Sequence, residues 1–112
     1  MTKGKENFTL KELQNKVDDY IKQFEEGYWP PLSMFAALVE ETGEIARLLN
    51  ALEGIKPKKI SEKKQLLKEE IGDLLFALVC LANHYNIDLS NSLISSLEKY
   101  SKRDTNRWTK KN

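Results

Sequence analysis

The sequence predicts an all-α protein of four helices, arranged as a four-helix bundle-like domain. Apolar residues recur at steps of three and four along most of the 112 residues, which is the helical period. Short clusters of Gly, Pro, Asn and Asp interrupt this pattern at three places, and no stretch alternates apolar and polar residues as a half-buried strand would. We therefore expect residues 1–112 to form one domain with a basic C-terminal segment at about 101–112.

The first helix is expected to begin after Thr9, because Glu12 follows it at the spacing of a capping box. Gly27 is expected to end this helix. The paired prolines 30 and 31 then predict a stiff, non-helical link. The apolar stripe of the first helix consists of Leu13, Val17, Tyr20, Ile21 and Phe24.

Ser33 is a candidate N-cap of the second helix, which Gly54 and Pro57 are expected to close. A third helix is expected from Ser61 to about Tyr85. Its residues 74–82 are apolar on every side, which indicates burial all round and, in so short a chain, contact with a second subunit.

The fourth helix is expected after a break at residues 86–88, with Asp88 or Ser90 as its cap. Its apolar stripe consists of Leu89, Leu93, Ile94, Leu97 and Tyr100.

The overall charge excludes some functions. Eighteen Lys and Arg against 17 Asp and Glu give a net charge of +1, so no general field attracts nucleic acid or an anionic membrane. The longest apolar run, residues 74–82, is far shorter than the roughly 20 residues of a membrane span. A single cysteine and a polar N-terminus without an apolar signal region predict a cytoplasmic protein.

Acidic residues occupy unexpected positions on the second and third helices. Glu41 falls in the middle of an apolar stripe that contains Met34, Leu38 and Ile45. On the third helix, Asp73 lies on the face of Ala77 and Cys80, with Glu70 one turn earlier. Glu41 and Glu44 form a second pair at the same spacing of three residues. Solvated acidic faces are the ordinary explanation of such strings, but two strings centred on apolar stripes argue against it.

Inward-facing carboxylates need a cation. Arg47 and Lys68 lie on other faces of their helices, which leaves hard divalent cations such as Mg²⁺ as the expected partners. A di-iron site would use Glu-x-x-His pairs, whereas the residue three positions before His84 is Leu81.

These acids also form a known pattern. Residues 40–44 (EETGE), followed after 25 residues by residues 70–73 (EIGD), resemble the EExxE…ExxD signature of the MazG family of nucleotide pyrophosphohydrolases. The similarity also covers residues 29–32 (WPPL), 72–76 (GDLLF) and 81–83 (LAN), as well as the pairs RD at 103–104 and RW at 107–108. The chain is most similar to the short single-domain members.

The resemblance implies the all-α MazG fold and Mg²⁺-dependent hydrolysis of an NTP or dNTP to the monophosphate and pyrophosphate, with Mn²⁺ as a possible substitute. Glu41, Glu44, Glu70 and Asp73 would be the metal ligands, and Glu40 would hold a second metal or orient the attacking water. The family also implies a homodimer or homotetramer, and housecleaning of nucleotide pools is the expected role.

Five further residues are candidates for substrate binding. Lys99, Arg103 and Arg107 recur at steps of four in the basic C-terminal region and could bind phosphate, the alternative being a solubilising tail. The family resemblance makes Asn83 a candidate contact to sugar or base, the alternative being a helix cap. Trp29 could stack on a base or only pack the bundle.

Two other functions stay open. Phosphoribosyl-ATP pyrophosphatases share the fold and the acid pattern. A non-catalytic oligomerisation or partner-binding module could use the acids for a structural cation.

Overall fold

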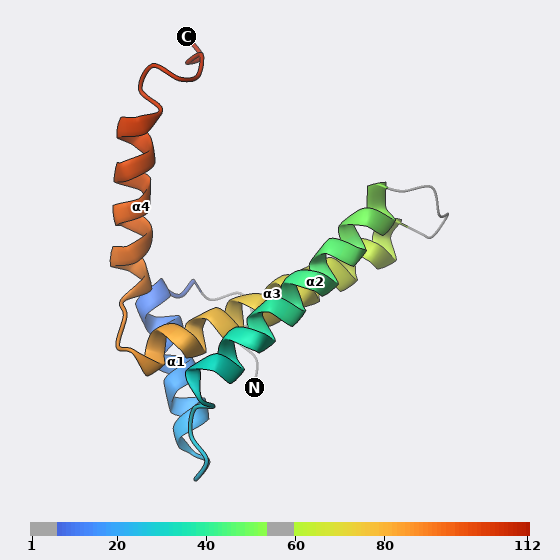
Figure 1. Cartoon of the computed structure of the whole chain (residues 1–112), viewed down its shortest axis with the longest axis vertical. Helices are drawn as coiled ribbons and strands as arrows, with labels where there is room; N and C mark the ends of the chain where they lie inside the picture. Colours follow the sequence, from blue (N-terminus) through green and yellow to red (C-terminus); the bar gives the residue numbers. More distant parts are fainter. Residues whose placement is uncertain (1–6, 54–59) are drawn as a thin grey trace.

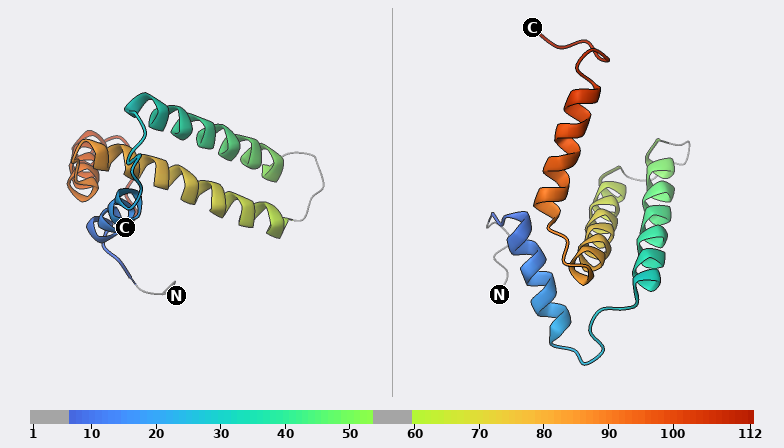
Figure 2. Two further views of the ribbon diagram at one scale, coloured as in Figure 1. Left: turned by 90° about the horizontal axis from the view of Figure 1, so that it is seen from below. Right: turned by 60° about the vertical axis from the view of Figure 1, so that its left-hand side comes forward.

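The computed structural model describes residues 7–53 and 60–112 and confirms an all-α chain. Its four helices are α1 (Leu10–Lys22), α2 (Pro31–Glu53), α3 (Ile60–His84) and α4 (Leu89–Arg103), and these described residues contain no strand. Helices α2 and α3 form a long antiparallel hairpin, α1 packs on α3, and α4 projects away from the hairpin (Figures 1 and 2).

Helix α1 starts as its capping box predicts. The Thr9 hydroxyl accepts a hydrogen bond from the Glu12 backbone N–H at 3.1 Å, and the Glu12 carboxylate accepts one from the Thr9 N–H at 2.8 Å. The helix ends at Lys22, earlier than Gly27. Gly27 instead makes the turn towards α2 with a φ of +62°, in the left-handed region that glycine enters without steric cost.

Helix α2 begins at Pro31, so the prediction of Ser33 as its cap is wrong. The carbonyl of Pro30 accepts hydrogen bonds from the Ser33 and Met34 N–H groups at 2.9 and 3.1 Å. Proline suits the first helical position, because its φ is already helical and it has no N–H to satisfy. Gly54 and Pro57, expected to close α2, lie outside the described residues.

The boundaries of α3 and α4 agree more closely with the sequence. Helix α3 begins at Ile60, which places the predicted cap Ser61 inside the helix, and it ends at His84. Asp88 is the cap of α4, since its carboxylate accepts a hydrogen bond from the Asn91 N–H at 3.1 Å. Helix α4 continues to Arg103, so the basic segment starts as helix.

The core of the single chain is small. Among the residues whose burial is described, the buried apolar side chains are Met34, Val79, Cys80 and Ala82, each at most 6% exposed. The all-round burial predicted for residues 74–82 is therefore only partly reached in one chain, where Leu75, Phe76 and Leu78 stay half-exposed.

The molecule is extended for its length. Its radius of gyration is 17.5 Å, whereas a compact domain of this size has about 13 Å. On α4, Leu93, Ile94 and Leu97 are each more than half exposed, and no described residue of that helix is buried. One copy of the chain thus packs three helices together and leaves the apolar stripe of the fourth uncovered. Across the described residues, no helix has the length and apolar character to cross a membrane.

Candidate functional site

Three carboxylates converge between α2 and α3. Because the two helices run antiparallel and pack closely, Glu41 from the middle of α2 faces Glu70 and Asp73, which lie one turn apart on α3. One oxygen from each of the three groups lies within 4.8 Å of the others. Glu41 and Glu70 are half-buried, and Asp73 is exposed.

The cluster is electrostatically unfavourable without a cation. Glu41 Oε2 is buried and has no hydrogen-bond partner among the described residues. Sharing a proton with Glu70, burial, and repulsion by Glu70, Asp73 and Glu44 together raise the pKa of Glu41 to about 7. An unpartnered buried oxygen beside two further carboxylates is a donor set that fits a hard divalent cation such as Mg²⁺.

The two other acids of the motif lie beside this group. Glu44 forms a salt bridge to Arg47, with Glu44 Oε1 and Arg47 Nη2 2.7 Å apart, yet it is close enough to contribute to the raised pKa of Glu41. Glu40 is exposed on α2. Among the described residues, the converging group comprises Glu41, Glu70 and Asp73, without Glu40 or Glu44.

An apolar cavity of about 570 Å³ adjoins the carboxylates. Glu41 and Asp73 form part of its wall, and most of the remainder is aromatic or aliphatic. Tyr20 packs edge-on against two other lining rings, with ring centroids 5.4 Å from Phe24 and 6.4 Å from Phe76. Further lining residues are Ile21, Glu26, Gly27, Tyr28, Trp29, Met34, Ala37, Ala77 and Cys80. Such a cavity can hold a planar ring next to a charged group at the carboxylates.

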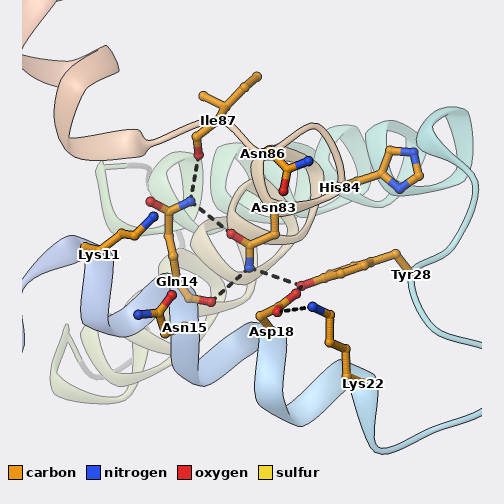
Figure 3. A pocket seen from close by; sticks show the side chains of 10 residues that line it. All are labelled: Lys11, Gln14, Asn15, Asp18, Lys22, Tyr28, Asn83, His84, Asn86 and Ile87. Atoms are coloured by element: carbon orange, nitrogen blue, oxygen red, sulfur yellow. Dashed lines mark hydrogen bonds and ion pairs between the residues drawn. The ribbon is translucent and has the colours of Figure 1, made fainter.

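Trp29 lines this cavity and is 63% exposed. Asn83, in contrast, lines a separate polar pocket of about 340 Å³ (Figure 3). Asn83 there bonds to Gln14 and Tyr28, and its Nδ2 lies 3.1 Å from the Tyr28 hydroxyl. Asn83 does not cap α3.

The predicted phosphate-binding cations lie on the arm formed by α4 and the residues after it. Lys99 and Arg103 stack on the ring of Tyr100, 4.9 and 4.6 Å from its centroid. Arg103 and Arg107 both approach Asp104, with N–O distances of 2.9 and 3.9 Å. This arm points away from the α2–α3 hairpin, so one chain does not bring these cations to its own acids (Figure 1).

Sequence reasoning did not single out Gln14, Asp18 or Tyr28, which surround Asn83. A signal for Gln14 was available, because it lies on the apolar face of α1 with Leu10 and Ile21, as Glu41 lies on that of α2. Gln14 is 4% exposed, so a polar residue within an apolar stripe again marks a specific interaction.

Comparisons with known proteins identify the family of the sequence. The sequence profile of the MazG nucleotide pyrophosphohydrolase domain matches residues 30–108. The chain is 50% identical to the YpjD protein of Bacillus subtilis over 103 residues, covering 92% of this chain and 93% of that protein. It is also 34% identical to rat dCTP pyrophosphatase 1 over 85 residues, which cover 73% of this chain and 46% of the rat protein.

Solved structures give the same assignment. A crystal structure of a Bacillus-conserved MazG protein, described as a nucleotide pyrophosphohydrolase, superimposes with a TM-score of 0.76 at 42% identity, covering 91% of this chain and 99% of the other. A crystal structure of B. subtilis YpjD also gives 0.76, at 48% identity, over 85% of this chain and 97% of that one. The paired acids of α2 and α3, the profile match and these structures show that the chain belongs to the family of MazG nucleotide pyrophosphohydrolases, in a short single-domain form.

Proposed function

We propose that the protein hydrolyses nucleoside or deoxynucleoside triphosphates to the monophosphate and pyrophosphate in a Mg²⁺-dependent reaction. The observation that carries this proposal is the convergence of Glu41, Glu70 and Asp73 beside an aromatic-lined cavity. A cation site next to a recess for a planar ring suits a substrate made of a polyphosphate and a base.

The carboxylates would hold the cation, with Glu41, Glu70 and Asp73 as the central ligands and Glu44 as a fourth after release from Arg47. Mg²⁺, or Mn²⁺ in its place, would supply neutralisation of phosphate charge and a lowered pKa of bound water. Glu41 has to be deprotonated to act as a ligand, so its raised pKa makes cation binding release a proton.

The remaining roles are assigned from the exposure of Glu40 and from the place of Trp29 in the cavity wall. Glu40, exposed beside Glu41, would orient the water that attacks the α-phosphorus, with pyrophosphate as the leaving group. Trp29 would stack on the base at the exposed side of the cavity.

The phosphate-binding cations would come from a second copy. Lys99 and Arg103 lie on α4 and Arg107 follows it, on an arm that points away from the α2–α3 hairpin and whose apolar stripe is uncovered. Burying that stripe in a homodimer or homotetramer would stabilise the assembly and could bring these cations to the partner's cavity. Removing chosen nucleotides from a cytoplasmic pool is the role that this activity would serve.

The decisive experiment measures pyrophosphate release from each NTP and dNTP with Mg²⁺. The panel includes dCTP because of the dCTP pyrophosphatase relatives. We expect pyrophosphate from at least one substrate, ¹⁸O from labelled water in the monophosphate, and loss of turnover in Glu41→Gln with the helical CD signal intact. Orthophosphate as the product, or no turnover with any nucleotide, would overturn the proposal.

Two outcomes would select the other functions. Turnover of phosphoribosyl-ATP with none of simple NTPs would indicate a phosphoribosyl-ATP pyrophosphatase. Stabilisation by Mg²⁺ or Ca²⁺ without any turnover would indicate a structural cation in a non-catalytic module.

A further inference from the structure

A continuous chain of hydrogen bonds joins three helices to the segment that precedes α2 (Figure 3). Gln14 accepts from the Leu89 N–H at 2.9 Å, and its Nε2 donates to the Ile87 carbonyl at 2.8 Å and to Asn83 Oδ1 at 2.9 Å. Asn83 Nδ2 donates to the Gln14 carbonyl at 2.9 Å and to the Tyr28 hydroxyl at 3.1 Å. These bonds connect α1, the end of α3 and the start of α4 to Tyr28.

The chain of hydrogen bonds continues from Tyr28 to a pair of charged residues. The Tyr28 hydroxyl donates to Asp18 Oδ1 at 2.6 Å, and Asp18 Oδ2 lies 2.7 Å from Lys22 Nζ. Hydrogen bonds from Lys22 and Tyr28 lower the pKa of Asp18, while burial and the Asp18 bond raise the pKa of Tyr28 to about 12. At neutral pH the phenol is therefore protonated and the carboxylate is ionised, which fixes the direction of the bond between them.

These bonds use most of the hydrogen-bonding capacity of the Asn83 amide. Both of its N–H donors are engaged, and its oxygen already accepts a bond from Gln14. An amide in this state has no N–H left for a nucleotide. Asn83 also lines the polar pocket, whereas Glu41 and Asp73 line the apolar cavity.

Tyr28 connects the two regions. It lines both the polar pocket and the apolar cavity, and Trp29, the next residue, lies on the wall of the cavity. Trp29 is 63% exposed and follows a left-handed turn at Gly27, so its own packing fixes its position only weakly. The bonds to the Tyr28 hydroxyl anchor the segment next to the cavity wall.

We propose that Asn83 and Tyr28 are positioning residues: the Asn83–Tyr28–Asp18 hydrogen bonds hold the Trp29 wall of the cavity in place for substrate binding. Asn83 acts on the substrate through Tyr28 and Trp29, in contrast to the direct contact to sugar or base expected from the sequence. The expected change in KM rests on the proposed nucleotide hydrolysis, whereas the expected change in Trp29 mobility does not.

The test uses Trp29 as a reporter in a Trp108→Phe background of the full chain. Tyr28→Phe, Asn83→Ala and the double variant are compared by fluorescence anisotropy of Trp29 and by steady-state kinetics on the best substrate of the nucleotide panel. Tyr85→Phe is the matched control, because it removes the hydroxyl of an exposed tyrosine directly after α3. Tyr28→Phe keeps the ring and removes only the hydroxyl, so it still tests the inference if Asn83→Ala fails to fold.

We expect both single variants to lower Trp29 anisotropy and to raise KM about three- to tenfold, with kcat within about twofold, because the carboxylates are unchanged. The KM and the Trp29 anisotropy of the double variant should equal those of the more impaired single variant, since both changes break the same connection. Tyr85→Phe should change neither quantity.

Three results would overturn the inference. In the first, Asn83→Ala raises KM while Tyr28→Phe leaves both KM and anisotropy unchanged, which indicates direct contact of Asn83 with the nucleotide. In the second, the two changes raise KM additively. In the third, anisotropy is the same in all variants. If the parent protein hydrolyses no nucleotide, the proposed function fails, while the anisotropy comparison still decides whether the hydrogen bonds hold Trp29.

Discussion

Replacing Gln14 by leucine should destabilise the protein substantially, although leucine is apolar and similar in volume. Gln14 is 4% exposed, and its side chain satisfies the Leu89 N–H, the Ile87 carbonyl and Asn83 Oδ1. Leucine leaves all three groups without that partner. A buried polar group that loses its partner costs about 1–3 kcal/mol, and these groups are only partly buried, so the expected loss is about 2–4 kcal/mol in the free energy of unfolding.

Urea unfolding followed by far-UV circular dichroism measures this loss, at fixed protein concentration because association contributes to stability. A drop in Tm of roughly 4 °C per kcal/mol should accompany it for a chain of this length. Gln65→Leu is the control, since Gln65 is exposed and makes one long bond to Glu69 at 3.5 Å. A change within about 0.5 kcal/mol is expected there. A Gln14→Leu protein as stable as the control variant would refute the reasoning.

Gln14→Glu tests the same bonds through pH. The ionised carboxylate of this variant still accepts from the Leu89 N–H but has no donor for the Ile87 and Asn83 oxygens. Only the protonated form can donate to one of them, so the pKa of the introduced carboxyl should be higher in the folded than in the unfolded protein. The variant should thus approach wild-type stability at low pH and lose stability as pH rises from the unfolded pKa to the folded one. A pH-independent difference from wild type would contradict this account.

Three further predictions concern the acids and the caps. The bond to Glu70, burial and the neighbouring carboxylates raise the pKa of Glu41 from 4.5 to about 7. The stability of metal-free protein should therefore fall as pH rises across that interval, and Mg²⁺ should raise Tm more at pH 8 than at pH 5. Equal shifts in Tm at both pH values would contradict this. Arg47→Ala frees Glu44 from its salt bridge and should tighten Mg²⁺ binding about two- to fivefold in calorimetry, whereas unchanged affinity would exclude Glu44 as a ligand. Asp88→Ala removes the bond to the Asn91 N–H and should cost about 1 kcal/mol in urea unfolding, with Asp88→Asn restoring most of it.

Local signals in the sequence predicted the starts of α1 and α4 and, to within one residue, both ends of α3. The cap Thr9 is confirmed, and of the two caps predicted for the fourth helix, Asp88 and Ser90, the structure selects Asp88; both caps are recognisable because a cap depends on residues three positions apart. Ser33 was misread because two start signals compete at that place, and a proline at the first helical position prevails over a serine two residues later. The acid cluster was also predictable in outline, since Glu41 and Asp73 each interrupt an apolar face.

Relations between distant segments were harder to predict. The environment of Asn83 depends on Gln14, which is 69 positions away, and helical periodicity carries no information on which helix meets which. The same limit applies to Lys99 and Arg103: their spacing predicts a shared face, but the direction of α4 relative to the hairpin depends on the turn at residues 85–88.

The position of Cys80 allows the rate of thiol labelling to report on the cavity. The chain has one thiol, and it lies in the wall of the aromatic cavity at 6% exposure. Burial raises the pKa of this thiol, and the thiolate is the species that reacts with disulfide reagents. Labelling at neutral pH therefore depends on transient exposure of Cys80, so its rate reports local opening around the cavity. A ligand in the cavity should slow labelling in proportion to its occupancy, giving a binding assay that needs no turnover and no added fluorophore.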